Sequence, residues 1–400
     1  MKFFYFILAV AGISLAGCSR GDTAPLKSTP TAPNAAVGSI VIEPQFSDVE
    51  PFAGGFARVK VGEKSAALVG YIDRKGKLKV NPKYRYAGDF AEGLAPVDVS
   101  VDGEWSKWGY IDAEGRTIIE PQFGNGEAFE DGYAVVAVGN PITGPRGLID
   151  KRGQFVVNPI YADLYRISKN RYSYRPNLDS RAGILDSSGK TIAEPQFNSL
   201  GVLAEGVAPA AFGKEGDKNG ERCGYVDAEG KIVIEPQFLQ CKKFSGGLAR
   251  VGAIVDGVGG WGFIDHKGKF VIKPQFNAAE NFHDGLAAVA VGSLEENAKW
   301  GFIDRTGAVV IAPQFDEVGF FENGRAVVRV GGGFGSQQRS EMRNALDQTK
   351  PVKAGKWGVI DKQGRFSVNP RFDRLEAPTD GLAPMRIGDH ITGKWGYIAL

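Results

Sequence analysis

Histidine and cysteine are scarce in this 400-residue chain, which contains three of each. Transition-metal sites are built mostly from these two residue types, and histidine is the commonest catalytic base. The motifs G-x-S-x-G, H-E-x-x-H and C-x-x-C, which mark hydrolases, metalloproteases and thiol redox enzymes, do not occur in the sequence. We therefore expect a protein that is not an enzyme and that carries no metal and no cofactor.

Neither sign of charge dominates the chain. It has 48 Lys and Arg against 46 Asp and Glu, a formal net charge of +2, whereas nucleic-acid-binding proteins usually show a clear basic excess. We therefore expect no nucleic-acid partner. Hydrophobic residues make up 43% and charged residues 24% of the chain, which indicates a globular protein rather than a disordered one.

The apolar run near the N-terminus, residues 3–11, is too short to span a bilayer permanently, which takes about 20 residues. Residues 1–17 have the pattern of a secretory signal peptide, and Leu15-Ala16-Gly17-Cys18 resembles the lipobox of bacterial lipoproteins. The resemblance implies cleavage before Cys18, lipidation of Cys18 and anchoring in a membrane. Ser19 suggests the outer membrane of a Gram-negative cell, facing the periplasm or the surface. The alternative is an ordinary signal peptide followed by a coincidental cysteine.

Residues 18–38 are rich in Pro, Ala, Ser and Thr and contain no aromatic residue. This composition predicts a disordered tether between the lipid and the folded domain, which we place at residues 39–400.

One motif recurs through the whole of residues 39–400. The glycines that end a Trp-Gly-like pair are 36–41 residues apart, except for 57 residues before Gly358. Each copy approaches W-G-[YF]-I-D-x-x-G, then P-[QK]-F, then F-x-x-G-L-A-x-V. This pattern strongly resembles the WG-repeat family of bacterial proteins. The resemblance implies a β-rich repeat domain and no known reaction. The marker glycines are Gly70, Gly109, Gly147, Gly183, Gly224, Gly262, Gly301, Gly358 and Gly396.

Each copy predicts three antiparallel strands. The W-G-Y-I segment is aromatic and β-branched, and an Asp with Gly three residues later fits a type I turn into the next strand. The second strand ends on proline, which cannot donate to a ladder and so belongs at a strand end or an edge. The G-L-A-x-V segment is the third strand. Because ~38 residues cannot bury their own apolar face, the copies must stack into one all-β domain.

The array begins and ends in the middle of a repeat. It starts with the P-Q-F half at residues 43–46 and finishes with the W-G-Y-I half at residues 395–398, so the two ends together bring the number of units to nine. In a closed propeller-like ring, the last strand would complete the first unit. Propellers usually have 4 to 8 four-stranded blades, however, which nine three-stranded units fit poorly. We therefore favour an open or superhelical β-solenoid, with a closed ring of about nine units as the alternative.

The repeat departs from its own pattern near the middle of the array. Arg146, Ala182 and Cys223 replace Trp in three consecutive copies, and after Pro159 a Tyr- and Arg-rich segment replaces the F-x-x-G-L-A signature. Tyr and Arg often anchor interfaces, so this segment is a candidate binding surface for a protein or glycan. A degenerate repeat with solvated Arg and half-buried Tyr is the alternative. The residues are Tyr161, Tyr165, Arg166, Arg171, Tyr172, Tyr174 and Arg175.

The remaining two cysteines lie close together in the sequence. Cys223 takes a Trp position, and Cys241 stands three residues after Phe238, where other copies carry mostly Val, Leu or Ala. Both side chains should therefore point inward within one repeat. In an oxidising periplasm they can form a disulfide. They can equally remain two buried thiols, and the sequence leaves both states open.

Three classes of function fit these features. The favoured one is a lipid-anchored envelope scaffold that binds a protein partner, because long repeat surfaces suit binding. The second is a carbohydrate or cell-wall binding module, with exposed aromatic residues such as Trp105 as stacking platforms. The third is a glycan-acting enzyme, which needs two carboxylates facing one cleft and which we rank last.

Overall fold

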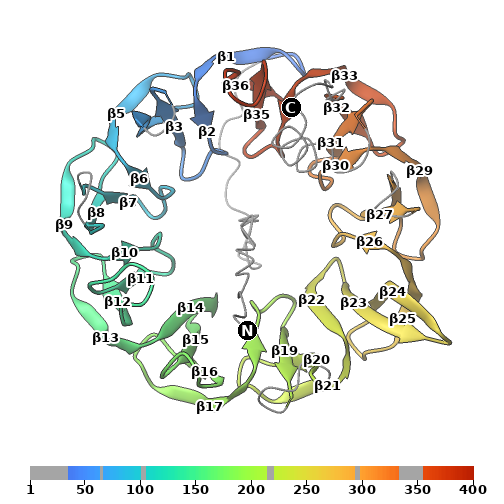
Figure 1. Cartoon of the computed structure of the whole chain (residues 1–400), viewed down its shortest axis with the longest axis horizontal. Coiled ribbons are helices and arrows are strands. Elements are labelled where there is room, and N and C mark those ends of the chain that lie inside the picture. The colour runs from blue at the N-terminus through green and yellow to red at the C-terminus, as the bar shows by residue number, and fades with distance from the viewer. Residues whose placement is uncertain (1–34, 64–65, 101–104, 214–219, 293–297, 333–354) are drawn as a thin grey trace, which may run out of the picture.

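The computed structural model describes residues 35–63, 66–100, 105–213, 220–292, 298–332 and 355–400. In these residues, 36 strands form nine four-stranded antiparallel sheets. The sheets stand as blades around a ring, each with its first strand toward the middle and its seven-residue fourth strand at the rim (Figure 1). The fold is a nine-bladed β-propeller.

The blades are numbered along the chain, with the strands given from the middle outward. Blade 1 is β2 (Asp48–Val49), β3 (Ala57–Val61), β4 (Leu68–Ile72) and β5 (Leu78–Tyr84); blade 2 is β6 (Tyr86–Ala87), β7 (Ala95–Asp98), β8 (Trp108–Ile111) and β9 (Thr117–Phe123); blade 3 is β10 (Asn125–Gly126), β11 (Tyr133–Ala137), β12 (Arg146–Asp150) and β13 (Phe155–Tyr161). Blade 4 is β14 (Asp163–Ser168), β15 (Arg171–Arg175), β16 (Ala182–Leu185) and β17 (Thr191–Phe197); blade 5 is β18 (Ser199–Leu200), β19 (Ala208–Phe212), β20 (Arg222–Val226) and β21 (Ile232–Phe238); blade 6 is β22 (Gln240–Ser245), β23 (Leu248–Val255), β24 (Val258–Ile264) and β25 (Phe270–Phe276). Blade 7 is β26 (Ala278–Ala279), β27 (Ala287–Val291), β28 (Lys299–Ile303) and β29 (Val309–Phe315); blade 8 is β30 (Glu317–Val318), β31 (Arg325–Val330), β32 (Lys356–Asp361) and β33 (Phe366–Phe372); blade 9 is β34 (Arg374–Leu375), β35 (Leu382–Ile387), β36 (Lys394–Ala399) and β1 (Ile40–Phe46).

Blade 9 closes the ring by combining the two ends of the domain. Its rim strand is β1, which pairs antiparallel with β36 so that Ile42 stands opposite Tyr397 and Phe46 opposite Trp395. The open or superhelical solenoid that we favoured from the sequence is therefore wrong, and the alternative of a closed ring of about nine units is confirmed. The repeat is out of phase with the ends of the domain because the chain itself supplies this closing strand.

The prediction of three strands per repeat was one strand short. A strand of two residues, such as Asp48–Val49 or Tyr86–Ala87, follows the P-Q-F motif in most blades and becomes the innermost strand of the next blade. Two residues leave no alternation of apolar and polar side chains in the sequence. This short strand makes each unit a four-stranded blade, as in known propellers.

The glycine of each W-G pair lies directly against the rim strand. In blade 2, Trp108 stands opposite Phe123 and Tyr110 opposite Ile119, so the rim strand carries two extra residues between these pairs. Pro121 sits in this bulge, where a missing N–H costs nothing. A Cβ on Gly109 would lie 2.6 Å from the Ile119 carbonyl oxygen. Close backbone approach thus explains the glycine of the repeat, and the bulge explains its proline.

Replacing such a glycine by alanine should destabilise the propeller strongly. In blade 6, a Cβ on Gly262 would meet the Ile272 carbonyl oxygen at 2.7 Å and the Pro274 nitrogen at 2.8 Å. We expect Gly262→Ala to lower the free energy of unfolding by about 2–4 kcal/mol, measured by denaturant unfolding. Gly259→Ala in the same strand is the control, because its Cβ would meet nothing closer than 3.6 Å. Equal losses in the two variants would contradict the close-approach argument.

The aspartate of D-x-x-G serves the turn, as its spacing indicates. Asp265 Oδ1 accepts hydrogen bonds from the backbone N–H groups of Lys267 and Lys269 at 2.9 and 3.0 Å. Gly268 follows at φ +76°, a conformation that favours glycine. The Asp of each other described D-x-x-G turn caps its backbone in the same way.

The apolar core lies between the blades. In one cluster, Phe263 and Ile272 of blade 6 pack with Phe282 and Val289 of blade 7, and the rings of Phe263 and Phe282 are 4.9 Å apart. Similar clusters occur around the ring and join neighbouring blades. No blade buries its apolar faces alone, so stability depends on the complete set of neighbours.

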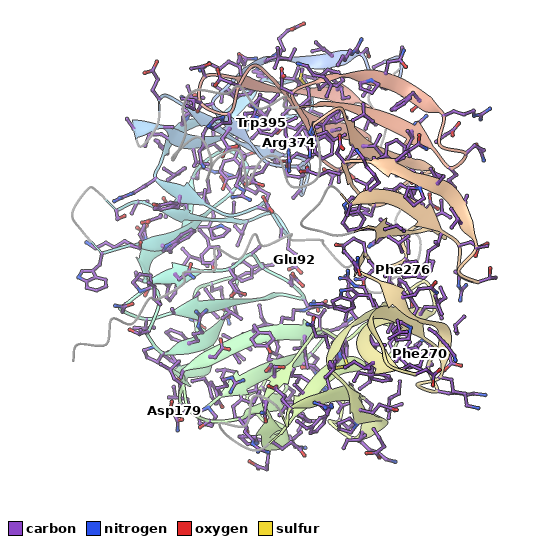
Figure 2. The ribbon with its side chains drawn as sticks, turned by 45° about the vertical axis from the view of Figure 1, so that its right-hand side comes forward. Glu92, Asp179, Phe270, Phe276, Arg374 and Trp395 are labelled. Carbon is purple, nitrogen blue, oxygen red and sulfur yellow. A yellow bond between two sulfur atoms is a disulfide. The ribbon has the colours of Figure 1, made fainter. Side chains whose placement is uncertain are left out.

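Polar contacts also connect neighbouring blades near the middle of the ring. Glu92 lies at the inner side of blade 2 (Figure 2). Its carboxylate accepts a hydrogen bond from the Gly132 N–H of blade 3 at 3.0 Å and pairs with Lys151 of blade 3 at 3.0 Å. Two further acids make the same kind of contact with the next blade: Glu205 with Gly247 and His266, and Asp284 with Gly324 and Lys362.

The two faces of the ring differ in regularity. One end carries the turns between first and second strands and between third and fourth strands, such as residues 50–56 and 73–77; we call it the turn face. The opposite end, the hairpin face, carries the connections between second and third strands, such as residues 138–145 and 388–393, whose length varies from blade to blade. Strand β1 starts at the turn face because it occupies a fourth-strand position.

Candidate functional site

The residue at the Trp position of each blade reaches toward the first strand of the next blade. Trp261 packs in one apolar cluster with Ala279, and Trp357 shares a cluster with Leu375. Each of these partners is the second residue of the next blade's first strand. The Trp position therefore forms a slot between blades, which is filled by an indole in five of them.

Cys223 and Cys241 occupy the two sides of this slot between blades 5 and 6. Their sulfur atoms are bonded at 2.08 Å, and their Cα atoms are 5.9 Å apart. The sequence placed both cysteines in one repeat, but the boundary between blades falls between β21 and β22. The disulfide therefore fastens one blade to the next, at the place where other blades use tryptophan.

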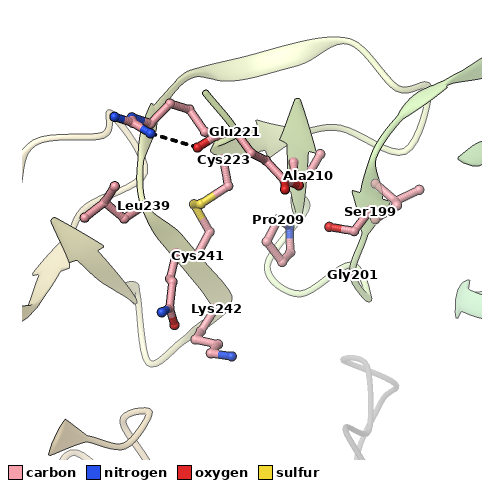
Figure 3. A pocket seen from close by; sticks show the side chains of 13 residues that line it. Ser199, Gly201, Pro209, Ala210, Glu221, Cys223, Leu239, Cys241 and Lys242 are labelled. Atoms are coloured by element: carbon pink, nitrogen blue, oxygen red, sulfur yellow. Dashed lines mark hydrogen bonds between the residues drawn. A yellow bond between two sulfur atoms is a disulfide. The ribbon is translucent and has the colours of Figure 1, made fainter. Parts of the chain in front are cut away.

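A pocket of about 560 Å³ opens beside this disulfide (Figure 3). Blade 5 lines it with Ser199, Pro209 and Ala211, and the start of blade 6 adds Gln240 and Lys242. Sequence reasoning singled out the cysteines but missed the pocket. The available signal was the coincidence of small residues on neighbouring strands, which is visible only once the register of the strands is known.

The Tyr- and Arg-rich segment forms β14, β15 and the residue that ends β13. Tyr172 and Tyr174 are 2% and 5% exposed, and their rings belong to the core between blades 3 and 4. Tyr161 packs against Tyr174 with ring centroids 5.1 Å apart. The hydroxyl of Tyr165 donates to the Leu200 carbonyl of blade 5. These tyrosines thus contribute more to packing than to an open surface.

The three arginines of the segment are held by neighbouring groups. Arg166 pairs with Asp131 of blade 3 at 2.6 Å, and Arg171 pairs with Glu229 of blade 5 at 3.2 Å. Arg175 donates to two backbone carbonyls, those of Ser180 and Asn198. The structure therefore brings the predicted residues together, and most of their contacts connect blade 4 to blades 3 and 5.

A carboxyl group with a raised pKa lies near this segment. Burial raises the pKa of Glu127 to about 7, the nearby charge of Arg146 lowers it, and the charge of Asp163 raises it. Arg146, which replaces Trp in blade 3, lies 3.9 Å from both carboxylates. Water still reaches 47% of the Glu127 side chain, so this group can exchange protons near neutral pH.

Replacing Glu127 should change how stability depends on pH. Because its pKa is raised from 4.5 to about 7 in the fold, the unfolded chain loses its proton first and stability falls as pH rises through this window. The glutamine of Glu127→Gln cannot ionise, so the stability of this variant does not show that decrease. We expect its stability relative to the wild type to increase from pH 5 to pH 8 by about 1 kcal/mol or less, since water screens the group. Denaturant unfolding at four pH values measures it, and a constant difference would contradict the raised pKa.

Other predicted features have these positions. Cys18 lies outside the described residues. Within the described ranges, no group of three or more His, Cys, Asp or Glu is arranged to hold a metal ion. The same part of the chain has no helix long and apolar enough to cross a membrane.

Solved structures similar to this chain show the fold alone. A eukaryotic initiation factor matches with a TM-score of 0.54 at 12% identity, over 84% of this chain and 95% of that one. A puromycin hydrolase matches with a TM-score of 0.38 at 12% identity, over 90% and 61% of the two chains. A prolyl endopeptidase matches with a TM-score of 0.40 at 13% identity, over 72% and 54%. The comparison with curated proteins finds no match.

One expectation from the sequence is corrected here. We expected that the chain is not an enzyme, but two hydrolytic enzymes are among the structures that resemble it, and we withdraw that expectation. With TM-scores below 0.5, these two matches identify no reaction in this chain either.

The family comparison follows the repeats. A model described as "WG containing repeat" matches nine segments of the chain. They are residues 37–64, 70–105, 108–140, 147–175, 183–214, 224–252, 261–294, 300–334 and 357–398. The matches cover most of the sequence, one for each unit of the array, and the chain therefore belongs to the WG-containing repeat family.

Proposed function

We propose that this protein is a lipid-anchored component of a bacterial envelope whose propeller binds a protein partner through its hairpin face. The observation that carries the proposal is that exposed apolar side chains recur at this face in several blades, beside others that are spread along the rim strands. The hairpins between second and third strands of different blades each present one or two of them. They are Trp105, Ile142, Leu178, Ile254, Val258 and Ile391, of which Ile142 is 80% exposed.

Apolar side chains on variable hairpins are typical of a recognition surface on a rigid scaffold. Beneath them, the turns and blade contacts repeat with little change. Strand β1 enters the domain at the turn face, so the segment that leads back to Cys18 joins the propeller on the side opposite the hairpin face. The Cys223–Cys241 disulfide supports an oxidising compartment such as the periplasm.

The test compares two sets of exposed apolar residues. The lipoprotein with Ile142, Leu178 and Ile391 changed to alanine is crosslinked in living cells, and its crosslinked proteins are identified by mass spectrometry. We expect a partner seen with the wild type to disappear. A control variant, Ile160→Ala with Val309→Ala, removes side chains that are 66% and 61% exposed from the rim strands and should keep the partner. Loss in both variants, or in neither, contradicts the proposal.

Lipid anchoring needs its own test, because the partner surface does not depend on it. Replacing Cys18 by serine should prevent incorporation of labelled palmitate and release the protein from the membrane fraction. An unlabelled wild-type protein would contradict the anchor and leave the hairpin face unaffected.

One observation favours a second candidate, a glycan ligand. The Trp105 indole is 66% exposed and Tyr86 is 53% exposed, and both belong to blade 2. Exposed aromatic rings can stack on sugars. A glycan array probed with wild-type protein and with Trp105→Ala distinguishes this candidate, since only stacking predicts a signal that Trp105→Ala abolishes.

A further inference from the structure

The pocket beside the disulfide exists because blade 5 lacks a bulky side chain at three adjacent positions. Ser199, Ala211 and Cys223 stand opposite one another across β18, β19 and β20. Every other blade places a large residue in this row. It is Trp in blades 2, 6, 7, 8 and 9, Lys60 in blade 1, Arg146 in blade 3 and Arg175 in blade 4.

The wall of the pocket has an apolar part beside polar side chains. Pro209, Ala211, Leu239 and the disulfide form the apolar part, and Ser199, Gln240 and Lys242 are polar. Gly201 allows the Pro209 ring to pack closely, because any Cβ at that position would lie 2.7 Å from Pro209 Cγ. The disulfide joins the two walls covalently. At about 560 Å³, the space is within the range of sites that hold small organic ligands.

The rim of the pocket carries more positive than negative charge. Lys242 and Arg222 contribute two cations, against the single carboxylate of Glu221. Arg222 donates to the Glu221 backbone carbonyl at 2.9 Å. The Lys242 carbonyl accepts the Tyr225 hydroxyl at 2.8 Å, which fixes the backbone at this lysine. An anion is the ligand that this rim favours.

We infer that this pocket binds a small aromatic carboxylate: a planar ring of about the size of indole, with one acidic group. The ring would lie along Pro209, Ala211 and the disulfide, next to the slot that five other blades fill with an indole. The carboxylate would lie toward Lys242. The lining contains no aromatic residue, so a sugar would find no stacking platform here. This inference goes beyond the proposed partner binding and depends on neither the hairpin face nor the lipid anchor.

The test fills the pocket with a side chain that other blades already hold at the same position. Arg329 and Arg386 occupy the position of Ala211 in blades 8 and 9, so Ala211→Arg should fold. Indole-3-acetate is titrated into the mature protein, and binding is followed by calorimetry and ligand-observed NMR. We expect saturable binding at micromolar to millimolar concentration and at least tenfold weaker binding to Ala211→Arg. Ala290→Arg, at the same position in blade 7, is the matched control and should bind as the wild type does.

A second variant separates the charge from the cavity and serves if Ala211→Arg fails to fold. Lys242→Gln should weaken the binding of indole-3-acetate severalfold but leave the binding of neutral indole-3-acetamide unchanged. Equal affinity of the wild type for both probes would overturn the assignment of an anionic ligand. No saturable binding of indole-3-acetate, benzoate or 1-naphthoate to the wild type, or unchanged binding to Ala211→Arg, would overturn the site.

Discussion

Truncating Ile42 and Phe46 to alanine is expected to open the propeller at blade 9. Both side chains are nearly fully buried, and both belong to the cluster that contains Trp395 and Tyr397. Large-to-small changes of buried Ile and Phe cost about 2–5 kcal/mol each, so the pair should cost about 4–10 kcal/mol. That is comparable with the whole stability of a typical protein. Because β1 is held in blade 9 by noncovalent contacts alone, we expect it to detach.

Detachment should propagate to the junction between blades 9 and 1. There the Tyr397 hydroxyl donates to the Glu50 carbonyl at 2.7 Å, and the rings of Phe52 and Tyr397 are 5.0 Å apart. Without β1, strand β36 becomes an exposed edge and these contacts lose their support. We expect hydrogen exchange to accelerate first in β35 and β36, and small-angle scattering to show a larger maximum dimension.

The matched control for this prediction lies in blade 2. Ile119 and Phe123 occupy the same positions in β9 and are equally buried, but the turn at residues 112–116 joins β9 covalently to β8 of its own blade. Ile119→Ala with Phe123→Ala should cost a similar free energy while the maximum dimension of the folded protein stays unchanged. If the maximum dimension increases in both double variants, or in neither, β1 is not the strand that closes the ring.

The repeated strands and turns of this fold can be predicted from the sequence, but the sequence does not decide whether the two ends of the domain join. The W-G-Y-I and P-Q-F segments each alternate side chains over several residues, and the D-x-x-G turns have a local hydrogen-bonding reason, so strands and turns could be predicted. Most inner strands, such as Ala278–Ala279, hold only two residues and are defined by their pairing with the second strand of the blade. Without them, a unit has three strands and a closed ring looks improbable.

The residues of the candidate site also divide into those that the sequence could indicate and those that it could not. Cys223 could be noticed because it replaces Trp, a residue expected at that point of the repeat. Ala211 and Gly201 could not, since each is ordinary in its own strand and matters only through its neighbours across the sheet. The tyrosines of blade 4 show the opposite case. Tyr172 and Tyr174 suggested a surface by their residue type, but they and the Ser173 between them are all buried in the middle of β15.

Removing the disulfide is expected to produce the second large loss of stability. The bond closes a loop with a sequence separation of 18 residues, for which chain entropy predicts about 3 kcal/mol of stabilisation. Cys223→Ser with Cys241→Ser should therefore lower the free energy of unfolding by about 3 kcal/mol, measured by denaturant unfolding. Dithiothreitol should destabilise the wild type by a similar amount and leave this variant unchanged. An equal response of the two proteins to dithiothreitol would contradict a structural disulfide.

A second double variant asks whether tryptophan and the disulfide are interchangeable. Cys223→Trp with Cys241→Ala recreates the pair that blade 6 offers to blade 7, Trp261 with Ala279. The adjacent pocket of about 560 Å³ leaves room for the indole, so overpacking should not occur. We expect this variant to recover most of the lost stability by burying the new ring, to be insensitive to dithiothreitol and to lose the binding of indole-3-acetate. A variant as unstable as the double serine would mean that the walls of this slot fit only the disulfide, and retained ligand binding would place the aromatic site elsewhere. This one variant therefore tests both the disulfide and the ligand site. The bond that joins blades 5 and 6 and the cavity beside it both occur where blade 5 lacks the tryptophan of the repeat.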